Sequence, residues 1–301
     1  MLVLRPRCVK RSPRRGGTPI IGGVAGFYDE LLEAAVAAAN AGSAVLRRYF
    51  RSGDLDVVRK GENDFVTRAD RESETAVLGE VRRRFPGHRI LAEEGGRGSG
   101  GGASEYEWLV DPLDGTTNFL QGLPVWCVSV ACRRGARVVA AAVLDPPGGN
   151  LFTAALGSGA RWNGRRMAVS GHPGLQGSFL ATGYPFRAHA TLDVYLGVFR
   201  EVFLAAKAIR RCGSAALDLA FTAAGVYDGF FEFRLSPWDI GAGVLLVREA
   251  GGTVTDVDGG EAFFASGNVV AGSPAVQREL REAVARHASE KDLDRLSPVR
   301  V

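Results

Sequence analysis

The sequence contains no long apolar run and little cysteine or histidine. No stretch of about 18 apolar residues occurs, so we expect no membrane span. Four cysteines and four histidines occur in 301 residues, and the cysteines show no paired metal-ligand spacing. A chain of this length buries a large core without disulfide bonds. We therefore expect reduced thiols in a cytoplasmic protein, and histidines that lie at the surface rather than on a metal.

Acidic residues are absent from the first 26 positions. That segment carries six basic residues, so the net charge of +4 becomes −2 for the rest of the chain. The mildly acidic body argues against a nucleic-acid-binding face across the fold. We expect residues 1–26 to be a disordered leader, although the same basic segment could contact RNA or an acidic partner.

Beyond this segment, the hydrophobic pattern is that of a mixed α/β protein. Apolar residues recur at helical spacing over 27–50. Residues 125–132 and 137–144 are predicted to be paired strands. After a junction with glycine and proline near residue 175, helices and short strands alternate. We thus expect two layered α/β halves, which are residues 27–175 and 176–301.

Two carboxylates stand three residues apart in the run Trp108–Asn118, where an apolar strand is predicted to end. Asp111 and Asp114 are followed by the hydroxyls of Thr116 and Thr117. Carboxylates bind hard cations, and hydroxyls with free backbone N–H groups bind phosphate. An Asp-Pro turn with an aspartate at a helix start is the simpler alternative. The complete run favours a metal-dependent reaction on a phosphate group.

Two further acids occupy similar positions. Glu93 directly follows the apolar run 90–92 and is therefore placed at the exit of a predicted strand. Asp239 lies in the first turn of a predicted helix that Pro237 begins. Favourable interaction with the helix dipole explains Asp239 equally well.

Four blocks of the sequence resemble the inositol monophosphatase family, and all four occur in the family's order. They are Asp64–Asp70, Leu91–Gly95, Asp111–Asn118 and Trp238–Gly252. The resemblance implies an α/β fold of αβαβα layers, of the inositol monophosphatase and fructose-1,6-bisphosphatase type. It also implies a Mg²⁺-dependent phosphomonoesterase, and a homodimer.

The resemblance implies two or three Mg²⁺ ions and assigns their ligands by matching positions. One ion would be held by Glu93, Asp111 and the backbone carbonyl of Leu113. A second would be held by Asp111, Asp114 and Asp239. Gly241, where an alanine is more usual in the family, is a mild departure close to this set.

Catalytic and substrate-binding roles follow from the same matching. Thr116, with Asp70 behind it, would orient and deprotonate the attacking water, and Glu93 would support this step. Phosphate would be bound by Gly115, Thr116 and Thr117. The polyol ring would be contacted by Asp114, Ala215, Glu232 and Asp239. Lys60 matches a basic residue near the metals, in a loop whose length varies among relatives.

Electrostatics supports a cation site independently of the resemblance. Carboxylates that converge on one pocket repel each other, each close pair by about 4 kcal/mol at an effective dielectric constant near 20. Divalent cations relieve this repulsion, and ligands that are all oxygen suit Mg²⁺. Two ions about 3.5–4 Å apart could activate the entering water and stabilise the leaving oxygen. No covalent nucleophile is then required.

Inositol-1-phosphate is the expected substrate, hydrolysed to myo-inositol and phosphate. Fructose-1,6-bisphosphate, histidinol phosphate and a 3′-phosphoadenosine nucleotide are alternatives that would use the same metal chemistry. An alternative of another class is a protein that binds RNA or a transcription partner through the basic segment 1–26. The intact carboxylate set argues against a fold that has lost its activity.

Overall fold

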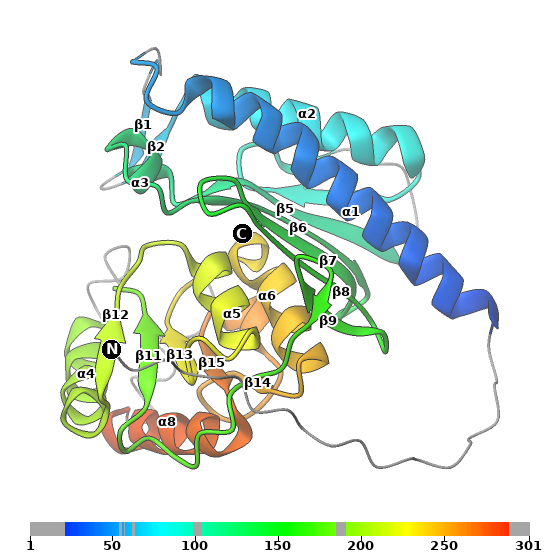
Figure 1. Cartoon of the computed structure of the whole chain (residues 1–301). Helices are drawn as coiled ribbons and strands as arrows, with labels where there is room; N and C mark the ends of the chain where they lie inside the picture. The colour runs from blue at the N-terminus through cyan, green and yellow to red at the C-terminus, as the bar shows by residue number, and fades with distance from the viewer. Residues whose placement is uncertain are drawn as a thin grey trace, which may run out of the picture.

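The computed structural model describes residues 22–53, 56, 58–61, 64–98, 104–184 and 191–288. The expectation of a disordered leader concerns residues that lie mostly outside these ranges. Figure 1 shows five layers, in the order helices, sheet, helices, sheet, helices. The αβαβα fold is therefore confirmed. In the described part of the chain, no helix is long and apolar enough to cross a membrane.

The first layer consists of α1 (Gly22–Tyr49) and α2 (Arg68–Arg84), which cover one face of the first sheet (Figure 1). Helix α1 begins earlier than the apolar pattern predicts. The two helices approach closely at Gly42, where a Cβ would lie 2.7 Å from both Ser73 Oγ and Val77 Cγ2. A larger residue at this crossing would push the helices apart.

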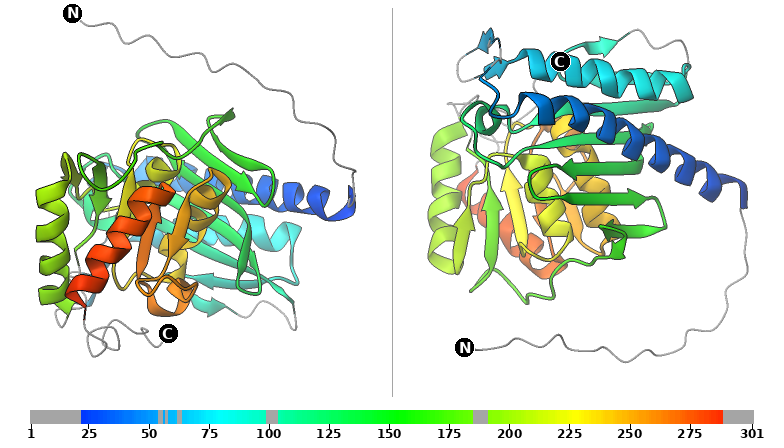
Figure 2. Two further views of the ribbon diagram at one scale, coloured as in Figure 1. Left: turned by 90° about the horizontal axis from the view of Figure 1, so that it is seen from below. Right: turned by 45° about the horizontal axis from the view of Figure 1, so that its top comes forward.

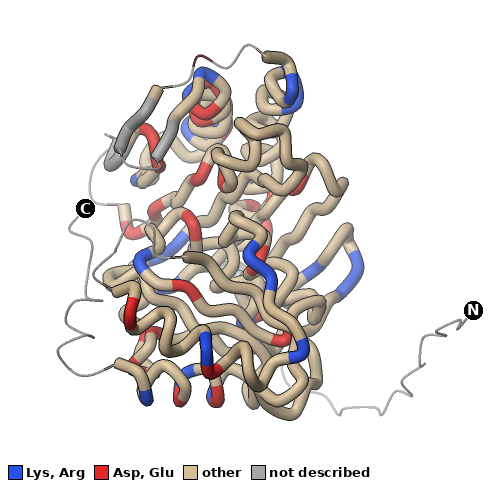
Figure 3. Tube along the Cα trace, turned by 90° about the vertical axis from the view of Figure 1, so that its left-hand side faces the viewer, with Lys and Arg blue, Asp and Glu red and all other residues tan. Residues whose placement is uncertain are grey.

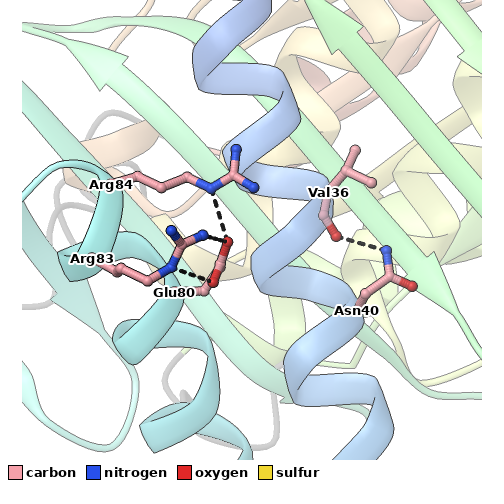
Figure 4. A network of polar contacts seen from close by, with 5 residues as sticks. All are labelled: Val36, Asn40, Glu80, Arg83 and Arg84. Carbon is pink, nitrogen blue, oxygen red and sulfur yellow. Dashed lines mark hydrogen bonds and ion pairs between the residues drawn. The ribbon is translucent and has the colours of Figure 1, made fainter.

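The same two helices carry exposed polar contacts (Figure 4). On α1, Asn40 donates from Nδ2 to the carbonyl of Val36 at 2.8 Å. On α2, Arg83 and Arg84 each donate to Glu80 at 2.8 Å. Ion pairs at this spacing on an exposed helix add only a few tenths of a kcal/mol each.

The first sheet has eight strands, in the order β10-β9-β8-β7-β6-β5-β3-β4. Their bounds are β3 (Arg89–Ala92), β4 (Gly96–Gly98), β5 (Tyr106–Asp114), β6 (Cys127–Arg134), β7 (Arg137–Asp145), β8 (Asn150–Ala155), β9 (Gly159–Trp162) and β10 (Arg165–Arg166). Strands β5 to β7 are buried along nearly their whole length because helices cover both faces.

Strands β3 and β5 run parallel, with Ala92 opposite Val110. The residues that follow Ala92 therefore lie beside the end of β5. The glycine- and serine-rich composition of residues 95–104 predicts a mobile loop. The segment Gly96–Gly98 forms strand β4 and pairs with β3, because the edge of β3 offers backbone hydrogen-bonding groups with which glycine can pair as well as any residue.

The middle layer consists of α5 (Ala215–Ala223) and α6 (Pro237–Glu249), buried between the two sheets. Small residues allow α6 to approach its neighbours. A Cβ on Gly241 would lie 2.7 Å from Leu109 Cδ1, and one on Gly243 would lie 2.4 Å from Leu219 Cβ. Glycine at 241 thus fits a close contact between α6 and β5.

The second sheet has five strands, in the order β12-β11-β13-β15-β14, and two helices cover its outer face. The strands are β11 (Phe179–Thr182), β12 (Ala208–Arg210), β13 (Gly229–Glu232), β14 (Thr253–Thr255) and β15 (Val269–Gly272). The helices are α4 (Leu192–Ala205) and α8 (Pro274–His287). Figure 2 shows the same stack from two other directions.

The remaining elements are short. They are the hairpin β1 (Val58–Gly61) and β2 (Asp64–Val66), the helix α3 (Thr116–Leu120) that directly follows β5, and α7 (Phe263–Ser266). In Figure 1, β1, β2 and α3 lie together at one end of the first sheet. This is the end toward which β3 and β5 carry their acidic residues.

Candidate active site

The end of β5 places Asp111 in the interior of the protein. Its side chain is only 2% exposed, and its Oδ1 accepts a hydrogen bond from the Leu113 N–H at 3.0 Å. The pairing of β5 with β6 is irregular between Asp111 and Asp114. Such an irregularity re-aims side chains, and it is common beside active sites.

The carboxyl groups of Glu93, Asp114 and Asp239 lie close enough to Asp111 to act on its ionisation. Burial raises the pKa of Asp111 well above its ordinary value, and the charges of these three acids raise it further. The structure thus brings together four acids from three separate segments of the sequence. Figure 3 shows several acidic positions, in red, in the middle of the molecule between the upper and lower layers.

Asp114 is held by the C-terminal half of the chain. Its Oδ2 accepts hydrogen bonds from Ser214 Oγ at 2.6 Å and from the Ala216 N–H at 2.8 Å. The Cys127 thiol lies 3.9 Å from the same oxygen. Burial raises the pKa of Asp114, and the hydrogen bonds from Ser214 and Ala216 oppose that rise.

Asp239 comes from the first turn of α6, two residues after Pro237. Its Oδ2 accepts a hydrogen bond from the Ser236 N–H at 2.7 Å, which caps the helix. The helix-start explanation and the acidic-site explanation of Asp239 are therefore compatible. One carboxyl oxygen closes the helix end, while its charge acts on Asp111.

Thr116 and Asp70 form a second polar pair beside the acids. Thr116 Oγ1 lies 3.3 Å from Asp70 Oδ1 and 3.0 Å from the Leu113 carbonyl oxygen. Asp70 is fully buried, and its Oδ2 accepts the Thr67 N–H at the start of α2. Burial raises the pKa of Asp70 to about 6, against the hydrogen bonds from Thr67 that lower it.

Gly115 occupies a backbone conformation that other residues rarely adopt, with φ at +94°. A Cβ at this position would lie 2.8 Å from the Val125 carbonyl oxygen. Glycine is therefore required where the chain turns from β5 into α3. Thr116 and the exposed Thr117 follow this turn, and the Thr116 hydroxyl lies beside Asp70.

Three of the four predicted polyol-contacting residues, Ala215, Glu232 and Asp239, come from the C-terminal half of the chain. Ala215 begins α5, directly after Ser214. Glu232 ends β13, and a Cβ on Gly183 would lie 1.9 Å from its carboxyl carbon. The charge of Glu232 acts on Asp218, and so does that of Asp114. Glu232 and Asp114 therefore both lie close enough to Asp218 for their charges to affect its ionisation.

Sequence reasoning missed Ser214 and Asp218 as parts of this region. Asp218 is 2% exposed, and its Oδ1 has no hydrogen-bond partner among the described residues. Burial and the neighbouring Glu232 raise the pKa of Asp218 well above its ordinary value. A serine before an apolar helix is an ordinary helix start, so no sequence pattern indicates that Ser214 reaches Asp114.

Three other residues singled out in the sequence are not shown to take part in the acidic region. The side chain of Lys60 is outside the described residues. Cys212 contacts the Tyr227 hydroxyl at 3.4 Å, and burial raises the pKa of its thiol, so it is not an activated nucleophile. His88 is not a simple surface residue, because it stacks on Phe85 and accepts a hydrogen bond from the Trp108 indole at 3.1 Å.

The donor set fits Mg²⁺ by its chemistry. All the predicted ligands are oxygen atoms, and Mg²⁺ keeps several waters, so it needs few protein ligands. In the described part of the chain, no three His, Cys, Asp or Glu side chains are already close enough to form a closed metal-binding group. The four acids are therefore close enough to repel one another without forming a preassembled set of ligands. The ligand roles of the individual residues stay a prediction.

The fold and this acidic region define the class of protein. The model of the inositol monophosphatase family matches residues 28–293, and the chain belongs to that family. Members are generally metal-dependent phosphatases. The resemblance that the four sequence blocks indicated is thereby confirmed.

Particular relatives carry two kinds of name. A protein of Pseudomonas aeruginosa named Nus factor SuhB is 46% identical over 255 residues, which cover 83% of this chain and 94% of that protein. The inositol-1-monophosphatase of Mesorhizobium japonicum is 42% identical, over 85% of this chain and 96% of the relative. The crystal structure of the extragenic suppressor protein suhB from Bartonella henselae is 41% identical. It covers 85% of this chain and 98% of its own, with a TM-score of 0.81.

Proposed function

We propose that the protein is a Mg²⁺-dependent phosphomonoesterase that hydrolyses inositol-1-phosphate to myo-inositol and phosphate. The observation that carries this proposal is the grouping of Glu93, Asp114 and Asp239 around the buried Asp111. A buried set of like charges needs a cation, and phosphate-ester hydrolysis needs positive charge beside the phosphate. Membership of the family supports the same reaction class.

In this proposal the acids hold the cations, and two other residues handle the water. The ligands are those that the family resemblance assigns: Glu93, Asp111, the Leu113 carbonyl, Asp114 and Asp239. Bound Mg²⁺ would supply the charge that acidifies water and neutralises the phosphate. Thr116 can donate its hydroxyl proton to Asp70 in a hydrogen bond and accept one from the attacking water.

Substrate recognition divides between the two halves of the chain. We propose that Gly115, Thr116 and Thr117 bind the phosphate through hydroxyl and backbone N–H groups. Ala215 and Glu232 would then contact the ring, where a carboxylate can accept hydrogen bonds from adjacent polyol hydroxyls. What supports this is that Glu232, at the end of β13, lies close enough to Asp218 for its charge to raise the pKa of that residue, as the charge of Asp114 also does.

A panel of phosphomonoesters tests the proposal. Steady-state rates with Mg²⁺ should be highest for inositol-1-phosphate. Fructose-1,6-bisphosphate, histidinol phosphate and 3′-phosphoadenosine nucleotides should be hydrolysed more slowly. If one of these is hydrolysed far faster, the chemistry stands and the substrate assignment is wrong. If no phosphomonoester is hydrolysed with Mg²⁺, the enzyme proposal itself is wrong.

A second candidate role is RNA or transcription-partner binding through the basic segment 1–26. The specific observation that favours it is the name Nus factor SuhB carried by the relative from Pseudomonas aeruginosa. The six basic residues of this segment would give salt-dependent binding to RNA. A gel-shift titration should then show binding that deletion of residues 1–26 abolishes. Equal binding by both forms would exclude the role.

We also propose a cytoplasmic homodimer, as the family resemblance implies. The exposed apolar side chains of α4 support this, because Leu196, Phe203 and Leu204 are 50%, 61% and 72% exposed. A monomer rarely exposes such residues together. Light scattering of the purified protein should give twice the mass of one chain, and the mass of a single chain would refute the dimer.

A further inference from the structure

Ser214 stands at the start of α5 but does not cap it. The residue is the N-cap of the helix by position, and its side chain makes no capping hydrogen bond. Its hydroxyl points instead to Asp114 Oδ2, at 2.6 Å. Because Ser214 is only 1% exposed, this hydroxyl is a buried group with a specific partner. An ordinary helix-start role does not explain it.

Asp114 performs the capping from another part of the chain. Its Oδ2 accepts the Ala216 N–H, one of the free donors of the first turn of α5, at 2.8 Å. The Cys127 thiol reaches the same oxygen at 3.9 Å and lies 3.7 Å from Ser214 Oγ. The hydrogen bonds of these three groups to Asp114 all go to Oδ2. The Ala215 N–H also acts on this carboxylate and lowers its pKa.

The position of Ser214 is itself fixed by contacts between the two halves. Asn118 donates from Nδ2 to the Cys212 carbonyl at 2.9 Å and to the Val125 carbonyl at 2.8 Å. Gly213 has φ at +83°, and a Cβ there would lie 3.2 Å from Asn118 Nδ2. The segment that carries Ser214 is thus fastened to the segment that carries Asp114.

We propose that Ser214 is a positioning residue that makes Asp114 a one-oxygen ligand and so favours Mg²⁺ over Ca²⁺. A carboxylate whose Oδ2 already accepts two close hydrogen bonds has only Oδ1 to offer a cation. Mg²⁺ requires an octahedral shell and is satisfied by single-oxygen ligands. Ca²⁺ takes six to eight oxygens and often binds both oxygens of a carboxylate. The inference rests on the proposed metal site.

Calorimetric titration of the metal-stripped protein with MgCl₂ and with CaCl₂ tests the proposal, and it does not depend on activity. The quantity measured is the ratio of the Ca²⁺ dissociation constant to the Mg²⁺ dissociation constant. Ser214→Ala frees Oδ2 and should lower this ratio about tenfold, the value of one hydrogen bond to a charged group. Ser214→Thr keeps the hydroxyl and should restore the wild-type ratio.

Two further variants control for folding. Ser178→Ala removes a buried hydroxyl that donates to the Leu175 carbonyl at 2.7 Å, far from the acids in the chain, and should leave the ratio unchanged. Ser214→Cys replaces the hydroxyl by a weaker donor of similar size and should give an intermediate ratio. This variant carries the test if Ser214→Ala does not fold.

The outcomes separate this inference from the proposed function. A wild-type ratio in folded Ser214→Ala, or in Ser214→Cys if alanine unfolds the protein, overturns the role of Ser214 while Mg²⁺ binding still supports the metal site. Equal lowering by Ser214→Ala and Ser178→Ala also overturns it, since the change would then be a general loss of stability. Failure of the wild-type protein to bind either ion overturns both proposals.

Discussion

The two ends of strand β5 each carry a buried acid, but the charged groups around the two acids are of opposite sign. At the start of the strand Glu107 is 4% exposed, and it forms ion pairs with Arg133 and Arg89. At its end Asp111 is 2% exposed, and among the described residues it forms no ion pair with lysine or arginine. Other acids surround it instead. The protein neutralises one buried charge with its own arginines, whereas our proposal assigns the neutralisation of the other to a cation from solution.

Replacement of Asp111 is expected to have the largest effect on activity. Asp111→Asn keeps an acceptor for the Leu113 N–H but removes the charge at the centre of the four acids. We expect kcat to fall about a thousandfold or more. Without metal, the variant should melt at a higher temperature than the wild type, because one buried repulsive charge is gone. Near-normal turnover would contradict the role of Asp111.

Replacement of Glu107 is the matched change at the other end of the strand, and it should have the opposite sign on stability. Glu107→Gln leaves Arg133, whose side chain is 16% exposed, without its charged partner. We expect a loss of about 2 kcal/mol of unfolding free energy, at the low end for a buried pair because Arg133 still reaches water. Urea unfolding measures it. A Glu107→Gln protein that is more stable than the wild type would contradict the claim that the arginines at this end of β5 stabilise the buried charge.

The pH dependence of stability isolates Asp70. Its pKa in the folded protein is about 6, above the ordinary value of 3.8. The folded state therefore binds a proton more tightly, and stability falls as pH rises from about 4 to about 6. In EDTA, the difference between wild type and Asp70→Asn should change by about 2–3 kcal/mol across this range. A constant difference would show that Asp70 ionises normally.

Gly115 offers a comparison between a constrained and an unconstrained turn. Gly115→Ala would place a Cβ 2.8 Å from the Val125 carbonyl at φ +94°, whereas Gly135 has φ +59° and open space around it. We expect Gly115→Ala to cost about 1–3 kcal/mol and to lower kcat/KM. Gly135→Ala should cost about 1 kcal/mol and leave kcat/KM unchanged. Equal kcat/KM in the two variants would show that the conformation of the turn at Gly115 does not matter for activity.

The smallest effect is expected at an acid on the surface of α2. Glu80, whose side chain is 20% exposed, forms ion pairs with Arg83 and Arg84 (Figure 4). Glu80→Gln should change the unfolding free energy by about 0.5 kcal/mol or less and leave activity intact. A larger loss of unfolding free energy would show that these ion pairs stabilise the protein more than exposed pairs ordinarily do.

Local patterns in the sequence predicted a mixed α/β protein and several of its long elements, whereas the αβαβα layers came from the family resemblance. Apolar patterns located α1 and the strands β5 to β7, because their faces are buried. The grouping of Glu93 and Asp111 could be anticipated from strand exits, since parallel neighbours end at the same edge. The substrate and the individual ligand roles came only from the family resemblance, and they remain proposals.

Contacts between distant segments were beyond the reach of sequence patterns. Nothing in the residues around Ser214 indicates that its hydroxyl crosses to Asp114, one hundred positions earlier. Strand β4 was missed because glycine-rich sequence signals flexibility, while pairing depends on the free edge of β3. The raised pKa of Asp218 depends on its burial and on the charges of Glu232 and Asp114, which only the fold brings near.

The central claim is that Glu93, Asp111, Asp114 and Asp239 together bind divalent cations. Crystals of the protein grown with Mn²⁺, a Mg²⁺ substitute whose anomalous scattering locates it, test this directly. The account predicts anomalous peaks in contact with the Asp111 carboxylate and bounded by the other three acids. Ordered side chains at all four positions with no peak beside Asp111 would contradict it.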